Sequence, residues 1–359
     1  MKVKIDDKTV NYRNVWMEGK TVNMIDQTRL PFEFRIHKTN NYRETAEAIR
    51  RMQIRGAPAI GVAASYGLAQ AALEFKDLEI KKFWKQMDAV IQEFLNTRPT
   101  AVDLHNMVKR MLLNMKKAET PHQCVEIALN ESQLIAEENA EACKNIGLLG
   151  RNLIKDGKGV LTHCNTGALG TVDYGTALSI IRFAHYQNKN FYVLATETRP
   201  WLQGRLTSWE LTQEDIKHYV IADNAAGYYM KKGDIQIVLV GADRILSNGD
   251  VINKIGTYTL ATLAHENQIP FVVAAPTTSI DLSQETGDVK IEERDSKEIK
   301  YVRGYIEEKQ EFQIIKIYPT DQAKNPVFDI TPAKYISKIV TENQIIEPPY
   351  DLKKQLRIK

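Results

Sequence analysis

From residue 159 onward, short apolar segments alternate with amphipathic stretches, and this alternation restricts the possible folds more than any other feature. The apolar segments are 159–163, 191–196, 218–223, 235–241 and 270–276. They are short and apolar at consecutive positions, as in strands that are covered on both faces. Most are separated by helical stretches, at 174–187, 209–217 and 256–267. Strands joined by helices in this way predict a Rossmann-like parallel sheet.

The first 155 residues follow a helical rhythm instead. Apolar residues recur every three or four positions, as in amphipathic helices, in the segments 57–75, 81–95, 102–118 and 122–154. Short strands are expected before them, at 2–7, 9–13 and 22–27. We therefore expect an α/β protein. Small N-terminal strands plus a helical domain form residues 1–150, a Rossmann-like domain forms 151–345, and a tail forms 346–359.

Composition and motif content argue against several classes of protein. The chain has 359 residues, 43% apolar and 26% charged, which is ordinary for a globular protein. A net charge of +3 without a basic block gives no indication of nucleic-acid binding. No signal-peptide core and no 18-residue apolar run occur, so we expect a cytoplasmic protein that does not bind membranes. Three cysteines without C-x-x-C spacing indicate neither disulfides nor zinc. Because dinucleotide and P-loop fingerprints are absent as well, we expect no metal and no cofactor.

Polar and reactive residues gather directly after the predicted strands. Cys164 follows the first strand, Gln203 comes soon after the second, and Asp243 follows the fourth. Asn253 and Lys254 come shortly before the next helix, whose start is a natural phosphate site. Because ligands of open parallel sheets bind outside the carboxyl ends of the strands, these residues predict one site.

Each of these residues also has a plainer interpretation. Cys164 could be a packed small hydrophobe, as we expect for Cys124 and Cys143 in their helices. Asp243 could cap a turn, and Lys254 could be a solvated lysine. The glycine-rich turn at 167–170 permits a close backbone approach, and the helix that follows could offer its first amides to an anion.

The N-terminal half has a candidate binding segment of its own. Arg55, Gly56 and Ala57 stand before a helix whose first turn contains Pro58, and this combines a guanidinium with backbone amides. Arg98 is a second arginine at a helix end. Two arginines and a lysine around one cysteine and one aspartate suggest a pocket for a phosphosugar.

Eight segments between about residues 12 and 343 match a known pattern: RGAPAIG, NTRPTAV, HCNTGALGT, YGTAL, ETRPWLQG, GADRI, NGDVINKIGTYTLA and NPVFDITP. They resemble the methylthioribose-1-phosphate isomerases of methionine salvage. This family shares its fold with the regulatory subunits of translation initiation factor two-B. The resemblance implies a homodimer that isomerises 5-methylthioribose 1-phosphate to 5-methylthioribulose 1-phosphate. It implies that Cys164 and Asp243 are catalytic. The substrate-binding residues that it implies are Arg55, Gly56, Ala57, Arg98, Gln203, Asn253 and Lys254.

The chemistry of such a substrate fits these residue types. Phosphate on the anomeric oxygen prevents opening to a free aldehyde, so an acid must protonate the ring oxygen. A carboxyl group in apolar surroundings has a raised pKa and can serve as that acid. A thiol can shuttle the carbon-bound proton or stabilise the charged intermediate. Proton transfer through an enol phosphate and hydride transfer both stay open.

Two alternative functions also stay open. The substrate could be 5-deoxyribose 1-phosphate or a ribose phosphate, or the protein could be a non-catalytic, initiation-factor-like regulator. Departures from the family pattern bear on the substrate. After Gly204 the usual extra residue is missing, and Asp173 stands where glycine is usual. The segment 301–322 is longer than expected.

Overall fold

The computed structural model describes residues 1–359 except 7, 99–101, 285, 287–288, 321 and 357–359. The described chain forms two compact units. Unit 1 contains Met1–Leu148 and Thr166–Arg182, and unit 2 contains Leu149–Asn165 and Phe183–Lys359.

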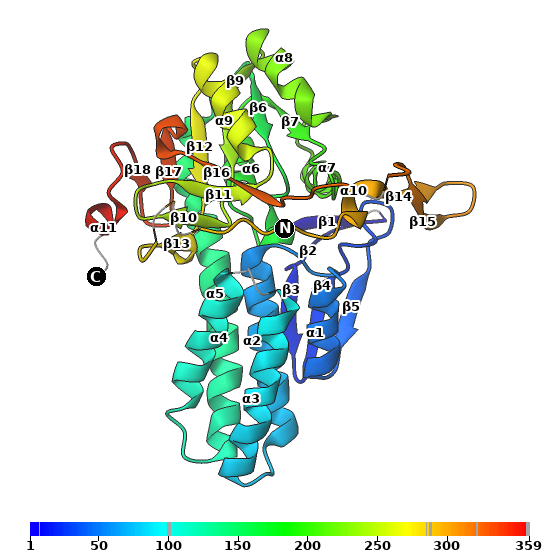
Figure 1. The fold of residues 1–359 in the computed structure, drawn as a ribbon, viewed down its shortest axis with the longest axis vertical. Helices are drawn as coiled ribbons and strands as arrows, with labels where there is room; N and C mark the ends of the chain where they lie inside the picture. The colour runs from blue at the N-terminus through cyan, green and yellow to red at the C-terminus, as the bar shows by residue number, and fades with distance from the viewer. Residues whose placement is uncertain (7, 99–101, 285, 287–288, 321, 357–359) are drawn as a thin grey trace. The chain divides into compact units, whose positions relative to one another are not determined.

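The described residues of unit 1 form five whole helices, part of a sixth and two small antiparallel sheets (Figure 1). The helices are α1 (Tyr42–Arg50), α2 (Ala57–Phe75), α3 (Ile80–Thr97), α4 (Val102–Met115) and α5 (Pro121–Gly150). One sheet pairs β1 (Lys2–Ile5) with β2 (Lys8–Asn11), and the other contains β3 (Val15–Glu18), β4 (Thr21–Ile25) and β5 (Ile36–Thr39). Most of α2 is buried, because its small alanine and glycine side chains allow neighbouring elements to approach from several sides.

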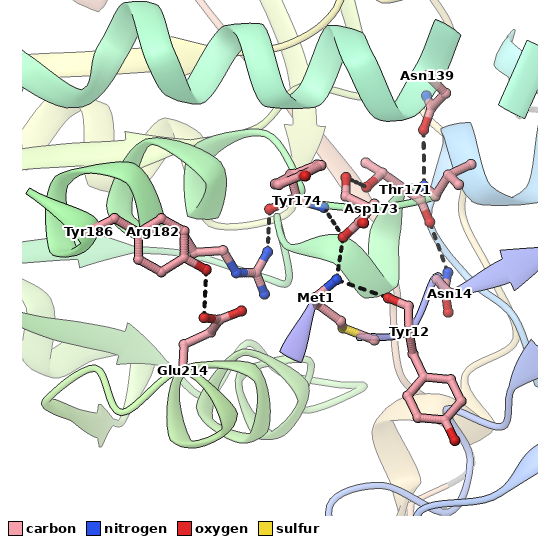
Figure 2. Close-up of polar contacts among 11 residues, drawn as sticks. Met1, Tyr12, Asn14, Asn139, Thr171, Asp173, Tyr174, Arg182, Tyr186 and Glu214 are labelled. Atoms are coloured by element: carbon pink, nitrogen blue, oxygen red, sulfur yellow. Dashed lines mark hydrogen bonds and ion pairs between the residues drawn. The ribbon is translucent and has the colours of Figure 1, made fainter. Parts of the chain in front are cut away.

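Figure 2 shows hydrogen bonds that hold the segment 166–182, some within the segment and some from residues far away in the sequence. The side chain of Asp173 accepts from the amino group of Met1 and from the backbone N–H of Tyr174. The amide of Asn14 donates to the carbonyl of Thr171 at 3.0 Å, and Arg182 donates to the carbonyl of Tyr174. Asp173, which departs from the family pattern, therefore forms structural contacts.

Unit 2 is built on a seven-stranded sheet with the strand order β18-β17-β12-β9-β6-β7-β8. Its strands are β6 (Gly159–Thr162), β7 (Tyr192–Thr196), β8 (His218–Ile221), β9 (Ile235–Val240), β12 (Phe271–Ala274), β17 (Lys338–Val340) and β18 (Ile345–Ile346). All neighbouring pairs are parallel except β17–β18. The chain starts at β6, builds outward to β8, and then continues on the other side of β6 with β9. This is the strand order of the classical dinucleotide-binding sheet.

Helices and smaller elements surround this sheet (Figure 1). The helices are α6 (Ala177–Tyr186, partly in unit 1), α7 (Gly204–Gln213), α8 (Ala226–Lys231), α9 (Thr257–Glu266), α10 (Lys297–Lys300) and α11 (Leu352–Gln355). Side chains of α8 and α9 pack with β9 and β12 in one apolar core. A second sheet contains β10 (Arg244–Leu246), β11 (Val251–Lys254), β13 (Ile280–Asp281) and β16 (Phe328–Thr331). A hairpin is formed by β14 (Tyr301–Ile306) and β15 (Glu311–Lys316).

The expected fold class, small strands with a helical part followed by a Rossmann-like parallel sheet, is confirmed. The division into domains at 1–150 and 151–345, with a tail at 346–359, stays a prediction. In the tail 346–359, Leu352 is fully buried in the core of unit 2. No described helix combines the length and the apolar character that a membrane span requires.

Candidate active site

Cys164 and Asp243 follow the two strands at which the strand order of the sheet reverses. β6 and β9 are direct neighbours, and Thr162 pairs with Leu239 near their carboxyl ends. Cys164 comes two residues after the end of β6, and Asp243 comes three residues after the end of β9. Connections leave these two strands in opposite directions, which opens a crevice at the carboxyl edge of such sheets. Unit 2 thus places both predicted catalytic residues at the usual ligand-binding position of this topology.

The backbone of Cys164 adopts a conformation that is uncommon for a cysteine. Its φ of 63° lies in the left-handed region, which non-glycine residues rarely occupy. Two hydrogen bonds hold it there: Cys164 donates its N–H to Thr198 Oγ1 at 2.9 Å, and its carbonyl accepts from Thr207 Oγ1 at 2.7 Å. Cys124 and Cys143 are fully buried, whereas Cys164 is partly exposed. This difference argues against the interpretation of Cys164 as a packed hydrophobe.

His163, which is not one of the predicted site residues, links three segments of the crevice. Its Nε2 lies 2.8 Å from the carbonyl of Ile255, so Nε2 carries the proton and donates it. Its Nδ1 then accepts from Thr196 Oγ1 at 2.6 Å. Burial lowers the pKa of His163, which favours this neutral form. The ring therefore joins the end of β6 to the end of β7 and to the residue after Lys254.

Asp243 is connected to the segment that carries Asn253 and Lys254. The N–H of Asp243 donates to the carbonyl of Ile252 at 3.0 Å. Asn253 donates from its amide to Thr257 Oγ1 at 3.0 Å. Lys254 donates from its ammonium to the carbonyl of Val327 at 3.0 Å. The ammonium of Lys254 also lies 4.7 Å from the centre of the Phe328 ring.

The start of α9 differs from our expectation of a helix N-terminus that is open to phosphate. Asp329 from β16 already accepts two of its backbone N–H groups, from Gly256 at 2.7 Å and from Tyr258 at 3.1 Å. Burial raises the pKa of Asp329 to about 6, although the two amides and Lys254 act against this rise. A carboxylate of the protein therefore occupies the place where a phosphate was expected.

Gln203 lies at the start of α7, beside the end of β7. It is 8% exposed, and its Oε1 is buried with no hydrogen-bond donor among the described residues. Gly204 allows this placement, because a Cβ at that residue would lie 2.1 Å from the carbonyl oxygen of Thr196. Thr207 of the same helix bonds to the carbonyl of Cys164. Hydrogen bonds therefore connect the neighbouring segments that carry the five predicted residues of unit 2. These residues are Cys164, Gln203, Asp243, Asn253 and Lys254.

The four other predicted residues belong to unit 1. Arg55, Gly56 and Ala57 lead into α2, and Gly56 has a φ of +97°. A Cβ at Gly56 would lie 2.2 Å from the carbonyl oxygen of Gly170, so the chain itself makes the close approach that we expected near the glycine-rich turn. Arg98 is the C-cap of α3, and residues 99–101 of its motif lie outside the described residues.

With this geometry established, similarity to known proteins identifies the family. The sequence matches the initiation factor 2 subunit family over residues 53–348. The chain belongs to this family. A relative from Geotalea uraniireducens (strain Rf4), named methylthioribose-1-phosphate isomerase, is 46% identical over 354 residues, which are 97% of this chain and 99% of that protein.

Two solved structures are similar along most of their length. The crystal structure of 5-methylthioribose 1-phosphate isomerase from Pyrococcus horikoshii OT3 has a TM-score of 0.87 at 38% identity, covering 97% of each chain. The crystal structure of the translation initiation factor eIF-2B, subunit delta, from A. fulgidus has a TM-score of 0.82 at 38% identity. It covers 95% of this chain and 98% of that one. The family resemblance and the enzyme class expected from the sequence, an isomerase, are confirmed.

The raised pKa of Asp329 predicts a measurable dependence of stability on pH. Its pKa in the folded protein, about 6, lies above its value in the unfolded chain. The stability that it contributes is therefore complete below about pH 4 and is lost as the pH rises through about 6. We expect the unfolding free energy of Asp329→Asn, relative to the native protein, to increase by about 2–3 kcal/mol between pH 4 and 7.5. Urea unfolding at several pH values measures this difference. The exposed Asp77→Asn serves as the control; an equal trend in both variants would contradict the prediction.

Proposed function

We propose that this protein isomerises 5-methylthioribose 1-phosphate to 5-methylthioribulose 1-phosphate, in methionine salvage and in the cytoplasm. The observation that carries the proposal is the position of Cys164 and Asp243 after the neighbouring strands β6 and β9. The names of the close relatives support it. A homodimer is part of the proposal, since twofold pairing is the commonest assembly of soluble proteins.

Asp243 is the proton donor in the proposed reaction. The substrate carries phosphate on its anomeric oxygen, so the ring opens only when its ring oxygen receives a proton. Asp243 follows the buried apolar strand β9 and is itself only partly exposed. In the proposed step, the protonated carboxyl group of Asp243 gives its proton to the ring oxygen.

Cys164 assists the second half of the reaction, in which hydrogen leaves carbon 2 and reaches carbon 1. Its partly exposed side chain comes from a backbone that is fixed by hydrogen bonds at both its N–H and its carbonyl. A thiol in this position can carry the proton between the two carbons. If the hydrogen moves as a hydride instead, the thiol stabilises the charge that develops.

The remaining predicted residues bind and orient the sugar phosphate. Gln203 has a buried carbonyl oxygen that can accept a hydrogen bond from a sugar hydroxyl. Asn253 and Lys254 lie on β11, next to the hydrogen-bond partner of Asp243. In unit 1, Arg55, Gly56, Ala57 and Arg98 are proposed as further contacts of the substrate. No described group of three or more His, Cys, Asp or Glu residues is arranged to hold a metal ion.

A comparison of substrates tests the proposed function directly. We expect kcat/KM to be highest for 5-methylthioribose 1-phosphate. We expect it to be about 10- to 200-fold lower for 5-deoxyribose 1-phosphate, which lacks the thioether. Ribose 1-phosphate, which carries a hydroxyl group at carbon 5, serves as the polar comparison substrate. Highest turnover with either of the other sugars would assign a different substrate, and no turnover with any of them would favour a regulatory protein.

Replacing the thiol separates the catalytic role of Cys164 from a packing role. Cys164→Ser should fold with an unchanged melting temperature, because the hydroxyl fits the same space. Its kcat should fall at least about a hundredfold, since a hydroxyl is far less acidic than a thiol. Cys143→Ala is the matched control, because this fully buried cysteine should affect stability and leave kcat unchanged. Near-native turnover in the serine variant would instead support packing.

Replacing the carboxyl group separates chemistry from binding. Asp243→Asn preserves the shape of the side chain but cannot donate the proton to the ring oxygen. We expect kcat to fall about 10²- to 10⁴-fold while product still binds within about tenfold. Asp250→Asn is the control from the turn between β10 and β11, because Asp250 accepts from the N–H of Ala333 at 2.7 Å and from Asn248 at 3.0 Å. Its loss should lower the melting temperature only. If Asp243→Asn behaved in the same way, Asp243 would be a structural cap.

A further inference from the structure

Two residues with left-handed backbone are bonded to each other in the loops after β6 and β7. Cys164 has a φ of 63°, and Thr198 has a φ of 61°. The N–H of Cys164 donates to Thr198 Oγ1 at 2.9 Å. Residues other than glycine rarely occupy this region, and they stay there only where surrounding contacts determine the conformation. The hydroxyl of Thr198 is therefore one of the contacts that hold Cys164 in its strained conformation.

This hydroxyl belongs to a continuous chain of hydrogen bonds. Thr198 Oγ1 lies 3.0 Å from Thr196 Oγ1, and Thr196 Oγ1 lies 2.6 Å from His163 Nδ1. The other ring nitrogen of His163, Nε2, lies 2.8 Å from the carbonyl oxygen of Ile255. The chain thus runs from Cys164 after β6, through the end of β7, to Ile255, which directly follows β11.

The donors and acceptors give this chain a single direction. The carbonyl of Ile255 can only accept, so Nε2 of the neutral His163 ring carries the proton and Nδ1 accepts. The hydroxyl of Thr196 is then the donor to Nδ1, and its oxygen accepts from the hydroxyl of Thr198. The carbonyl of Thr196, at 3.3 Å, is a more distant acceptor for that same hydroxyl. Thr198 Oγ1 keeps its lone pairs for the N–H of Cys164.

Burial makes each member of the chain hard to replace. Thr196 and Thr198 are fully buried, and His163 is 2% exposed. A buried N–H that loses its acceptor is unfavourable, so without the Thr198 hydroxyl the backbone of Cys164 should relax towards another conformation. The loop itself has a separate support, because the carboxylate of Asp223 accepts from the N–H of Thr198 at 2.7 Å. Loss of the hydroxyl alone should therefore leave the loop in place.

We propose that Thr198, supported by Thr196, is a positioning residue for Cys164. The proposal rests on the proposed function and deepens it. The directions open to a side chain depend on the backbone angles of its own residue, so the bond to Thr198 restricts where the Cys164 thiol can lie. A displacement of about 1 Å can reduce turnover about a hundredfold. This restriction should therefore act on kcat much more than on substrate affinity.

The test compares two substitutions of Thr198 in the full chain, with 5-methylthioribose 1-phosphate as substrate. Thr198→Val keeps the branched shape but has no hydroxyl, and we expect its kcat to fall at least about tenfold. Its KM should change by less than about threefold. Thr198→Ser keeps the hydroxyl and should retain kcat within about threefold of the native value.

Two further variants show whether the chain is responsible. Thr196→Val removes the acceptor of the Thr198 hydroxyl but leaves the carbonyl of Thr196 as a substitute. Its kcat should fall by at least about threefold, which is less than in Thr198→Val. Thr45→Val is the matched control from unit 1, because Thr45 is a fully buried threonine whose hydroxyl lies 2.7 Å from that of Thr39. It should lower the melting temperature and leave kcat unchanged.

Amide hydrogen exchange provides a readout that does not depend on the substrate. Protein that is isotopically labelled only at the cysteine nitrogens gives three backbone amide signals, since the chain has three cysteines. We expect the Cys164 amide to exchange at least about tenfold faster in Thr198→Val and at the native rate in Thr198→Ser. The amides of Cys124 and Cys143 lie in α5 and report whether the rest of the fold has changed.

The outcomes separate this proposal from the proposed function. If the native protein isomerises the sugar phosphate and Thr198→Val keeps the native kcat, the positioning role is wrong and the function stands, whatever the exchange rate. An equal loss of kcat in the serine and valine variants would also overturn the proposal, because the hydroxyl would not be the cause. If Thr198→Val does not fold, native kcat and native Cys164 exchange in Thr196→Val would overturn it. If no sugar phosphate is turned over while Cys164 exchange still depends on the hydroxyl, the positioning of Cys164 stands and the function is wrong.

Discussion

The reversal of strand order between β6 and β9 is the constraint on which the proposed site depends. Both strands are buried in the centre of the sheet, so their side chains are occupied by packing. Only the residues after the strand ends are available for chemistry. Because the two connections leave in opposite directions, neither covers the other's strand end. Cys164 and Asp243 therefore acquire their places from topology, and the neighbouring segments need only fix their orientation.

His163 supplies much of that orientation. It is 2% exposed and carries two polar ring atoms, which would be unfavourable without partners. Both atoms are satisfied, one by a backbone carbonyl and the other by a hydroxyl. Gly256 makes room for the ring, since a Cβ there would lie 3.1 Å from the Cε1 of His163. The segment after β6 and the segment after β11 are thus held together by a side chain that stays neutral.

The regular part of the fold and most of the candidate site could be predicted from the sequence, for different reasons. The strands of the central sheet are apolar on both faces, and the helices of unit 1 repeat with a clear period, so pattern alone locates them. Cys164 and Asp243 are indicated because a polar residue after an apolar strand lies at a predictable edge.

Other features depend on contacts between distant segments and leave no local signal. The hairpin β14–β15 was not predicted as strands, because its sequence mixes charged and apolar residues without strict alternation. Asp329 comes 73 residues after Gly256, whose N–H it accepts, so its role as a helix cap is invisible in the sequence around α9.

Three strained backbone positions of unit 2 lie in the loops that follow β6 and β7. Cys164, Thr198 and Leu202 all have positive φ, at 63°, 61° and 57°. Each such residue typically costs about 1–3 kcal/mol and persists only where surrounding contacts determine the conformation. Asp223 supplies such contacts: its carboxylate accepts from the backbone N–H of Thr198 at 2.7 Å and from that of Arg199 at 2.8 Å. The Thr198 hydroxyl in turn accepts a hydrogen bond from the N–H of Cys164. The same loop leads into Gln203. A single carboxylate at the end of β8 thus stabilises the strained backbone on which both the thiol and the glutamine are presented.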